Sequence, residues 1–239
     1  MNRKTPAIDA SAMPVPPLDL TRPAADQIFA AVKSAIMDTS LHPGRMISEN
    51  EVGALFGASR TPVREAFTHL REEGLILTRP SRGTYVSRIS EQQVRGAQFL
   101  REALEVAVVE RLCTQGLPDT AAAEITECLA RQEAALHAGD KAAFQVQDDR
   151  FHTILADATG YDRAATLLTR EKAVLDRLRV LSLNDADQMA KLLAEHRGIF
   201  DAVHAGYTGQ AMDRMRRHLR RILDTLSTLV DENQDYFEA

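Results

Sequence analysis

The feature that most constrains this chain is a very short connection between two amphipathic helices. Apolar residues at helical spacing predict one helix over about 49–56, opened by a capping-box pattern at 48–51 and ended by Gly57. A second helix is predicted over about 61–73, with Pro62 in the first turn, where its missing N–H costs nothing. Two helices joined by so short a turn form a helix-turn-helix arrangement.

Elements on both sides extend this unit. A further amphipathic helix is predicted over about 23–40, before the pair. After the pair, β-prone runs at 75–78 and 84–87 flank a basic tip at 79–83, which predicts a hairpin. The order helix, helix, turn, helix, hairpin predicts a winged helix-turn-helix domain over residues 20–89.

The rest of the chain is predicted to be a tail and a helical bundle. Residues 1–19 contain four prolines and little periodicity, so we expect a flexible tail. Residues 90–235 have helical periodicity interrupted by glycine, proline and asparagine, which predicts helices at about 91–116, 119–138, 140–158, 162–182, 186–206 and 208–234. The expected fold class is mainly α: an N-terminal winged helix-turn-helix and a C-terminal all-α antiparallel helical bundle of six to seven helices.

Composition predicts a protein of the reducing cytoplasm without a membrane segment. No apolar run approaches the ~18 residues of a membrane span, and residues 1–17 lack the apolar region of a signal peptide. The two cysteines, Cys113 and Cys128, fit neither a disulfide framework nor a zinc-ribbon spacing. The chain has a net charge of −5, but residues 1–90 have a net charge of +2, with 11 Lys+Arg and 9 Asp+Glu. This distribution argues against nonspecific coating of polyanions and still permits a local basic face that binds DNA.

Basic residues on the second helix and the hairpin predict contacts with DNA. Val63, Phe67 and Leu70 form the apolar face of that helix, so Arg64 should point outward, with Arg60 at the helix start. The N-terminal residues of such a helix read bases, and the fork of arginine spans O6 and N7 of guanine. Hydroxyls and free N–H groups there bind phosphates, and a basic wing tip reaches the minor groove or the backbone. The alternative is a set of solvated arginines on an ordinary small helical unit. The predicted DNA contacts are Ser59, Arg60, Thr61, Arg64, Arg82 and Gly83.

Three runs of sequence resemble a known family. They are Ser-Glu-Asn-Glu-Val at 48–52, Ser-Arg-Thr-Pro-Val-Arg-Glu-Ala at 59–66 and Arg-Pro-Ser-Arg-Gly-Thr-Tyr-Val at 79–86. Together they look like the GntR family of bacterial regulators. The remainder of the chain resembles the FadR-type branch of that family, which carries an all-helical FCD effector domain. The resemblance covers nearly everything after about Thr21.

The resemblance implies particular roles for residues of the winged domain. Arginines at the positions of Arg60 and Arg64 read bases in the family, and a glycine at the position of Gly83 approaches the minor groove. Relatives often carry a further arginine early in the second helix, where this chain has Asn50. The base preference is therefore expected to depart from that of relatives at this contact.

One aspartate and three histidines of the helical region are candidate metal ligands. Asp148 and His152 are four residues apart and share one helix face, whereas the neighbouring Asp149 lies on another. From spacing alone, the histidines are better explained as structural residues. The resemblance changes this interpretation, because a metal-binding subset of FCD domains uses one Asp and three His at these places. The implied ligands of a divalent ion, Zn²⁺ first and Ni²⁺ or Mn²⁺ as alternatives, are Asp148, His152, His196 and His218.

The resemblance also implies a small-molecule effector. Arg101 matches an arginine that faces the effector cavity in relatives and is suited to binding a carboxylate at two points. The alternative is an ion pair with Glu105, four residues on. The arginines at 214–221 are interpreted as the solvated face of the last helix.

The resulting hypothesis is a regulator that changes its affinity for DNA when a ligand binds. We expect a homodimer on a pseudo-palindromic double-stranded operator, a carboxylate effector in the helical domain, and repression released by that effector. Three rival hypotheses remain at this point: a metal-dependent enzyme, a regulator for which the metal itself is the signal, and a ligand-binding domain without metal.

Overall fold

The computed structural model describes residues 16–182 and 186–238. It divides the chain into two units. The described residues up to Glu91, joined by those from Leu229 onward, form the first unit. Gln92–Thr228 form the second. No helix among the described residues is both long and apolar enough to cross a membrane.

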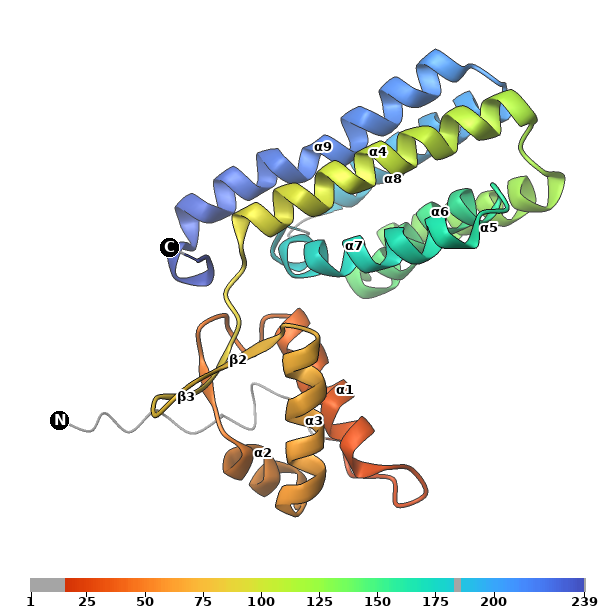
Figure 1. Cartoon of the computed structure of the whole chain (residues 1–239). Helices are drawn as coiled ribbons and strands as arrows, with labels where there is room; N and C mark the ends of the chain where they lie inside the picture. The colour runs from red at the N-terminus through yellow and green to blue at the C-terminus, as the bar shows by residue number, and fades with distance from the viewer. Residues whose placement is uncertain (1–15, 183–185, 239) are drawn as a thin grey trace. The chain divides into compact units, whose positions relative to one another are not determined.

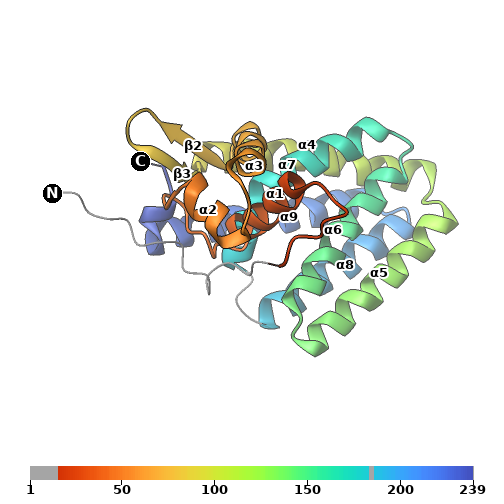
Figure 2. The ribbon, with the colours of Figure 1, turned by 90° about the horizontal axis from the view of Figure 1, so that it is seen from below.

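The first unit contains three helices and a small sheet (Figure 1). Its elements are α1 (Ala24–Met37), β1 (Met46–Ile47), α2 (Glu49–Phe56), α3 (Arg60–Glu72), β2 (Ile76–Arg79) and β3 (Gly83–Val86). The three strands are antiparallel in the order β1-β3-β2, with Tyr85 opposite both Met46 and Leu77. Figure 2 shows the β2–β3 hairpin projecting from the helices of this unit as a wing.

Local signals account for the turn between α2 and α3. The Ser48 hydroxyl accepts a hydrogen bond from the backbone N–H of Glu51 at 3.2 Å, and the Glu51 carboxylate accepts one from the Ser48 N–H at 3.1 Å. This is the predicted capping box. Gly57 ends α2 with φ of 60°, in the left-handed region that favours glycine. The core beneath the turn consists of fully buried apolar side chains, among them Ile28, Val52, Val63, Phe67 and Leu70.

The second unit is a bundle of long helices. Its elements are α4 (Glu91–Gln115), α5 (Asp119–Ala138), α6 (Lys141–Asp157), α7 (Asp162–Ser182), α8 (Ala186–His204) and α9 (Thr208–Glu232). Helices α5, α6 and α8 pack side by side, as Figure 2 shows. One continuous core joins these helices with α4 and α9. A winged helix-turn-helix followed by an all-α bundle of six helices among the described residues confirms the predicted fold class.

The segment after α9 makes contacts that the sequence does not predict. A 3₁₀ turn, η1 (Gln234–Tyr236), follows α9, and Phe237 pairs with Ile89 in an isolated parallel bridge. The Ile89 N–H donates to the carbonyl of Tyr236 at 2.8 Å, and the Tyr236 ring stacks on His42. Phe237 and Ile89 are both buried. The C-terminal segment is therefore part of the first unit.

Candidate DNA-binding surface and metal centre

Helix α3 has one buried and one exposed face, and the predicted base-reading arginines lie on the exposed face. Val63, Ala66, Phe67 and Leu70 are buried against the core, and Arg60 and Arg64 are exposed. The Arg64 side chain is 68% exposed, and its Nε lies 3.6 Å from a carboxylate oxygen of Glu49. Such a solvent-screened pair is weak, so the Arg64 guanidinium can exchange it for a base or a phosphate.

The start of α3 presents donors that suit a phosphate. Ser59 is the N-cap of the helix, but its hydroxyl makes no capping hydrogen bond. Ser59 and Thr61 are both exposed, beside the N–H groups of the first turn, which have no partner within the helix. The positive end of the helix dipole adds to the attraction for an anion.

The wing tip presents a second basic point. Ser81 and Gly83 both have positive φ, 61° and 109°, which turns the chain tightly between β2 and β3. A side chain at position 83 would place its Cβ 3.1 Å from the sulfur of Met46, so glycine keeps this backbone accessible. Tyr85 donates its hydroxyl hydrogen to the Arg82 carbonyl at 2.7 Å. The Arg82 side chain is exposed, and all six predicted DNA contacts lie either at the start of α3 or at this tip.

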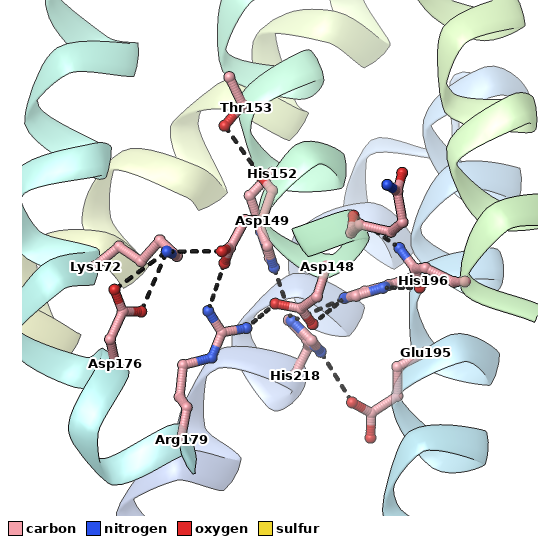
Figure 3. A network of polar contacts seen from close by, with 12 residues as sticks. Asp148, Asp149, His152, Thr153, Lys172, Asp176, Arg179, Glu195, His196 and His218 are labelled. Atoms are coloured by element: carbon pink, nitrogen blue, oxygen red, sulfur yellow. Dashed lines mark hydrogen bonds and ion pairs between the residues drawn. The ribbon is translucent and has the colours of Figure 1, made fainter. Parts of the chain in front are cut away.

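The four predicted metal ligands come together inside the second unit (Figure 3). Asp148 and His152 come from α6, His196 from α8 and His218 from α9, and all four are buried. The Nε2 atom of His218 lies 3.2 Å from Nε2 of His152 and 3.4 Å from Nε2 of His196. The Nε2 atom of His196 lies 3.5 Å from a carboxylate oxygen of Asp148. Asp149 points instead toward Lys172 and Arg179.

A second layer of polar groups determines how the three imidazoles are oriented. The carboxylates of Glu105 and Glu195 contact Nδ1 of His152 and His218, the latter at 2.9 Å. Since a carboxylate can only accept, each Nδ1 carries the hydrogen and each Nε2 presents its lone pair to the centre. The Gln132 amide oxygen accepts in the same way from Nδ1 of His196, at 2.9 Å. This arrangement is the one found around histidines that bind metals.

The donor set fits a divalent cation. For a tetrahedral ion bound at 2.0–2.1 Å, the ligand atoms lie roughly 3.3–3.4 Å apart, close to the distances between the imidazole nitrogens. Three lone pairs directed at one point, with a carboxylate beside them, repel one another unless a positive charge lies between them. Among the described residues, neither oxygen of Asp148 receives a hydrogen bond, although Arg179 forms an ion pair with one of them. The residues therefore suit a metal ion.

Burial keeps the imidazoles in the protonation state that a metal requires. It lowers the pKa of His218 to about 4, with the Glu195 carboxylate opposing this shift. Burial, followed by the neighbouring His218 and His152, holds the pKa of His196 well below its ordinary value. Although burial alone would raise the pKa of Glu105, Arg101 and then His152 hold it well below the ordinary range. At neutral pH the centre therefore contains neutral His196 and His218 and an ionised Glu105.

Comparison with known proteins identifies both parts of the chain. Residues 24–86 match the model of the bacterial regulatory proteins of the gntR family, and residues 98–221 match the FCD domain. The HTH-type transcriptional repressor RspR of Escherichia coli K12 is 35% identical over 221 residues, which cover 92% of this chain and 96% of that protein. The chain belongs to the GntR family.

Other relatives agree with this assignment. An uncharacterized HTH-type regulator from an unstable DNA locus of Streptomyces ambofaciens is 35% identical and covers 88% of both chains. The solved structure of a GntR-type regulator from Rhodococcus sp. RHA1 shares the fold, with a TM-score of 0.67 and 24% identity over 85% of this chain and 97% of that one. This GntR protein, with its FCD domain, is thus a transcriptional regulator and belongs to no enzyme family among those matched.

A cavity adjoins the histidine cluster in the FCD domain. Its volume is about 90 Å³, and the lining residues include His152, His218, Arg101 and Arg179 together with leucines of α7, α8 and α9. The Arg101 guanidinium is buried and paired with Glu105 at 2.7 Å, so the predicted pairing and the position beside the cavity both occur. Burial and then Arg101 lower the pKa of Arg179 to about 9, which leaves it charged at neutral pH.

Several residues of this FCD site were not predicted from the sequence. Gln132, Glu195 and Arg179 reach the site from α5, α8 and α7. The position of Glu195 directly before His196 was visible, but nothing in the sequence indicates that it contacts His218 instead. Glu105 was named only as a partner for Arg101.

Proposed function

We propose that this GntR regulator is a repressor that binds a specific operator through its winged domain, and whose FCD domain binds a divalent metal and a small carboxylic acid. The convergence of three imidazole Nε2 atoms and Asp148 carries the proposal. Zn²⁺ is the first candidate because neutral nitrogen donors and one carboxylate match its preferences, and Ni²⁺ or Mn²⁺ are alternatives. His152, His196, His218 and Asp148 would hold the ion.

The cavity beside the histidine cluster supports a carboxylate as effector. A bound divalent ion supplies a positive charge that a carboxylate oxygen can bind. Arg101, Arg179 and Arg221 add guanidinium groups at the same cavity, whose remaining walls combine leucines and Ile222 with Gln188 and Thr225. Because Glu105 balances the charge of Arg101, and Asp148 and Asp149 pair with Arg179, the net positive charge that faces a ligand would come mainly from the bound ion. The cavity volume of about 90 Å³ favours an acid with few heavy atoms.

The DNA-binding surface supports recognition of a pseudo-palindrome by a homodimer in the cytoplasm. Arg60 and Arg64 are exposed at the start of α3, where helix-turn-helix proteins read bases, and Arg82 extends the contact from the wing. Two copies related by a two-fold axis read two half-sites. Repression is proposed because the similar protein of Escherichia coli is named a transcriptional repressor. The effector would stabilise one arrangement of the two heads over the other.

The test combines metal analysis with operator binding. Elemental analysis of protein purified without chelator should give about one equivalent of a divalent metal per chain, which His196→Ala removes. Operator affinity should fall for Arg64→Ala and stay unchanged for Arg163→Ala, an exposed arginine of α7 that serves as a matched control. A screen of small organic acids by gel shift should identify one that weakens operator binding only when the metal is present.

The two rivals that concern the metal and the ligand each have their own outcome in the same experiment. Protein without metal that still responds to an acid supports a ligand-binding domain without metal. Operator binding that follows metal alone, with no response to any acid, makes the metal the signal. If no acid and no metal alters operator affinity, the proposed switch is wrong.

A further inference from the structure

The arginines of α9 divide into two groups. Arg220 pairs with Glu102 of α4 at 2.6 Å, and Arg216 pairs with Asp213 of its own helix at 3.3 Å. The other three arginines line a pocket between α8 and α9 whose volume is about 220 Å³. This pocket is called the arginine pocket below, and its lining consists of Arg214, Arg217, Arg221, Glu195 and His218.

Two of the three guanidinium groups reach α8 at positions one turn apart. A Cβ atom at Gly198 would lie 2.4 Å from the Nη1 atom of Arg214, so the missing side chain lets this guanidinium lie against α8. The Arg221 guanidinium donates to the Glu195 carboxylate at 2.6 Å. Gly198 and Glu195 are three residues apart on α8, which is about 4.5 Å along the helix axis. The guanidinium groups of Arg214 and Arg221 therefore converge, although their residues are seven positions apart on α9.

The arginine pocket has an excess of positive charge. Among the residues that the structure describes, Glu195 is the only acidic residue in its lining. Within the same part of the chain, Arg214 and Arg217 form no ion pair, and the Nε atom of Arg217 donates to the backbone carbonyl of Asp213 at 3.3 Å. His218 is neutral at neutral pH, because burial lowers its pKa to about 4. Three guanidiniums and one carboxylate leave a net charge of +2, and neighbouring positive charges repel one another unless an anion lies between them.

We propose that the arginine pocket binds a phosphate group, which is either free inorganic phosphate or the phosphoryl end of a small phosphorylated molecule. A phosphate group carries close to two negative charges at neutral pH and so matches the charge of the pocket. Its oxygens point in several directions, and each can accept hydrogen bonds from a different guanidinium. A carboxylate has only one charge and two oxygens in one plane, so it matches this pocket less well.

The arginine pocket and the metal centre lie on opposite sides of His218. The Nε2 atom of His218 is directed at the imidazoles of His152 and His196, whereas its Nδ1 atom contacts Glu195. Figure 3 shows Glu195 and His152 on opposite sides of the His218 ring. Arg221 lines both the arginine pocket and the cavity beside the histidine cluster, but Arg214 and Arg217 line only the former. The phosphate group would therefore occupy a second site, separate from that of the proposed carboxylic acid.

The experiment is isothermal titration calorimetry of the full chain with inorganic phosphate at constant ionic strength. One phosphate should bind per chain. Arg214→Ala and Arg217→Ala should each weaken binding about 10-fold, the lower end for a hydrogen bond to a charged group, because both side chains are exposed. The double variant should show no measurable binding. Arg216→Ala removes the same charge from the same helix outside the pocket, and it should bind phosphate as tightly as the wild type.

A substitution that changes no charge tests the convergence of the guanidiniums. In Gly198→Ala, the new Cβ displaces the Arg214 guanidinium from α8. Phosphate binding should therefore weaken, while circular dichroism should show the same helix content as the wild type. A Gly198→Ala variant that binds phosphate as tightly as the wild type would contradict the proposed geometry.

Two further titrations identify the source of the phosphate group and exclude the metal. Phenyl phosphate that competes with inorganic phosphate supports a phosphorylated organic ligand, whereas binding of inorganic phosphate alone supports the free ion. Protein stripped of metal by a chelator should still bind phosphate, because the arginines are not metal ligands. The phosphate site is therefore tested whether or not the proposed metal centre exists.

Several outcomes would overturn the proposal. Phosphate binding that the double variant keeps and that metal-free protein loses would place the anion at the metal centre. An equal loss in Arg216→Ala would mean that only the overall charge of α9 matters, and the absence of saturable binding would leave no site. Operator affinity that falls in the double variant, without phosphate binding in the wild type, would assign Arg214 and Arg217 to DNA instead.

Discussion

Replacing Glu195 with glutamine tests whether the second layer around the histidine cluster controls metal affinity. The Glu195 carboxylate accepts from Nδ1 of His218 at 2.9 Å and from Arg221 at 2.6 Å. Glutamine has nearly the same shape, but it lacks the negative charge that makes the imidazole of His218 a better donor to a metal. Removing such a partner typically lowers metal affinity by about 10- to 100-fold. The Glu195 side chain is 32% exposed, so solvent screens part of the effect and we expect a loss of about 10-fold, or ~1.4 kcal/mol.

The assay is competition for Zn²⁺ between the metal-free protein and a chromophoric chelator at pH 7.5. Glu133→Gln is the matched control. Glu133 is a partly exposed carboxylate that is also paired with an arginine, Arg197, at 2.9 Å, but its partner is not a histidine of the cluster. The control should bind Zn²⁺ as tightly as the wild type. Equal affinities for wild type and Glu195→Gln, or an equal loss in the control, would refute the reasoning.

Three further predictions concern other parts of the chain. Arg64→Ala should weaken operator binding by about 1–3 kcal/mol and relax base preference at one position, whereas Arg82→Ala should mainly reduce the dependence of affinity on salt, both measured by fluorescence anisotropy. In metal-free protein, burial holds the pKa of His218 at about 4, below the ordinary 6.5, so the unfolded chain binds this proton first as pH falls. The contribution of this residue to the free energy of unfolding is therefore fully present above pH 6.5 and is lost, by up to ~3 kcal/mol, as the pH falls toward 4. Equal unfolding free energies from urea denaturation at pH 7 and pH 4.5 would contradict this prediction. Phe237→Ala should destabilise the first unit by about 3–5 kcal/mol in thermal unfolding, because the ring is 3% exposed and contacts the chain around Ile89; an unchanged melting temperature would mean that the C-terminal segment does not stabilise this unit.

Contacts between residues close in the chain could be predicted from the sequence. The capping box at Ser48, the left-handed Gly57 and the basic hairpin tip each arise from side chains and backbone within a few residues of one another. The apolar face of α3 follows from helical spacing alone, and it leaves Arg64 on the exposed side. The elements of the winged domain were predictable because short-range features of this kind determine where they begin, end and turn.

The metal centre depended much more on tertiary structure. Spacing alone could place Asp148 and His152 on one helix face, but His196 and His218 come from helices that only bundle packing brings to the same point. The family resemblance named these four residues, yet it did not indicate that Gln132, Glu195 and Glu105 would orient the imidazoles. Those contacts join residues 23 to 64 positions apart, and hydrophobic packing of the helices decides which side chains meet.

The same distinction applies to the exposed residues of the regulator. The sequence determined that the start of α3 and the wing tip are basic, because charge and helix period are properties of short segments. Only the tertiary structure decided that, among the described residues, Phe99 and Leu100 of α4 are exposed and that Phe237 returns to Ile89. Whether an apolar side chain is buried depends on which distant segments reach it, and no local pattern contains that information.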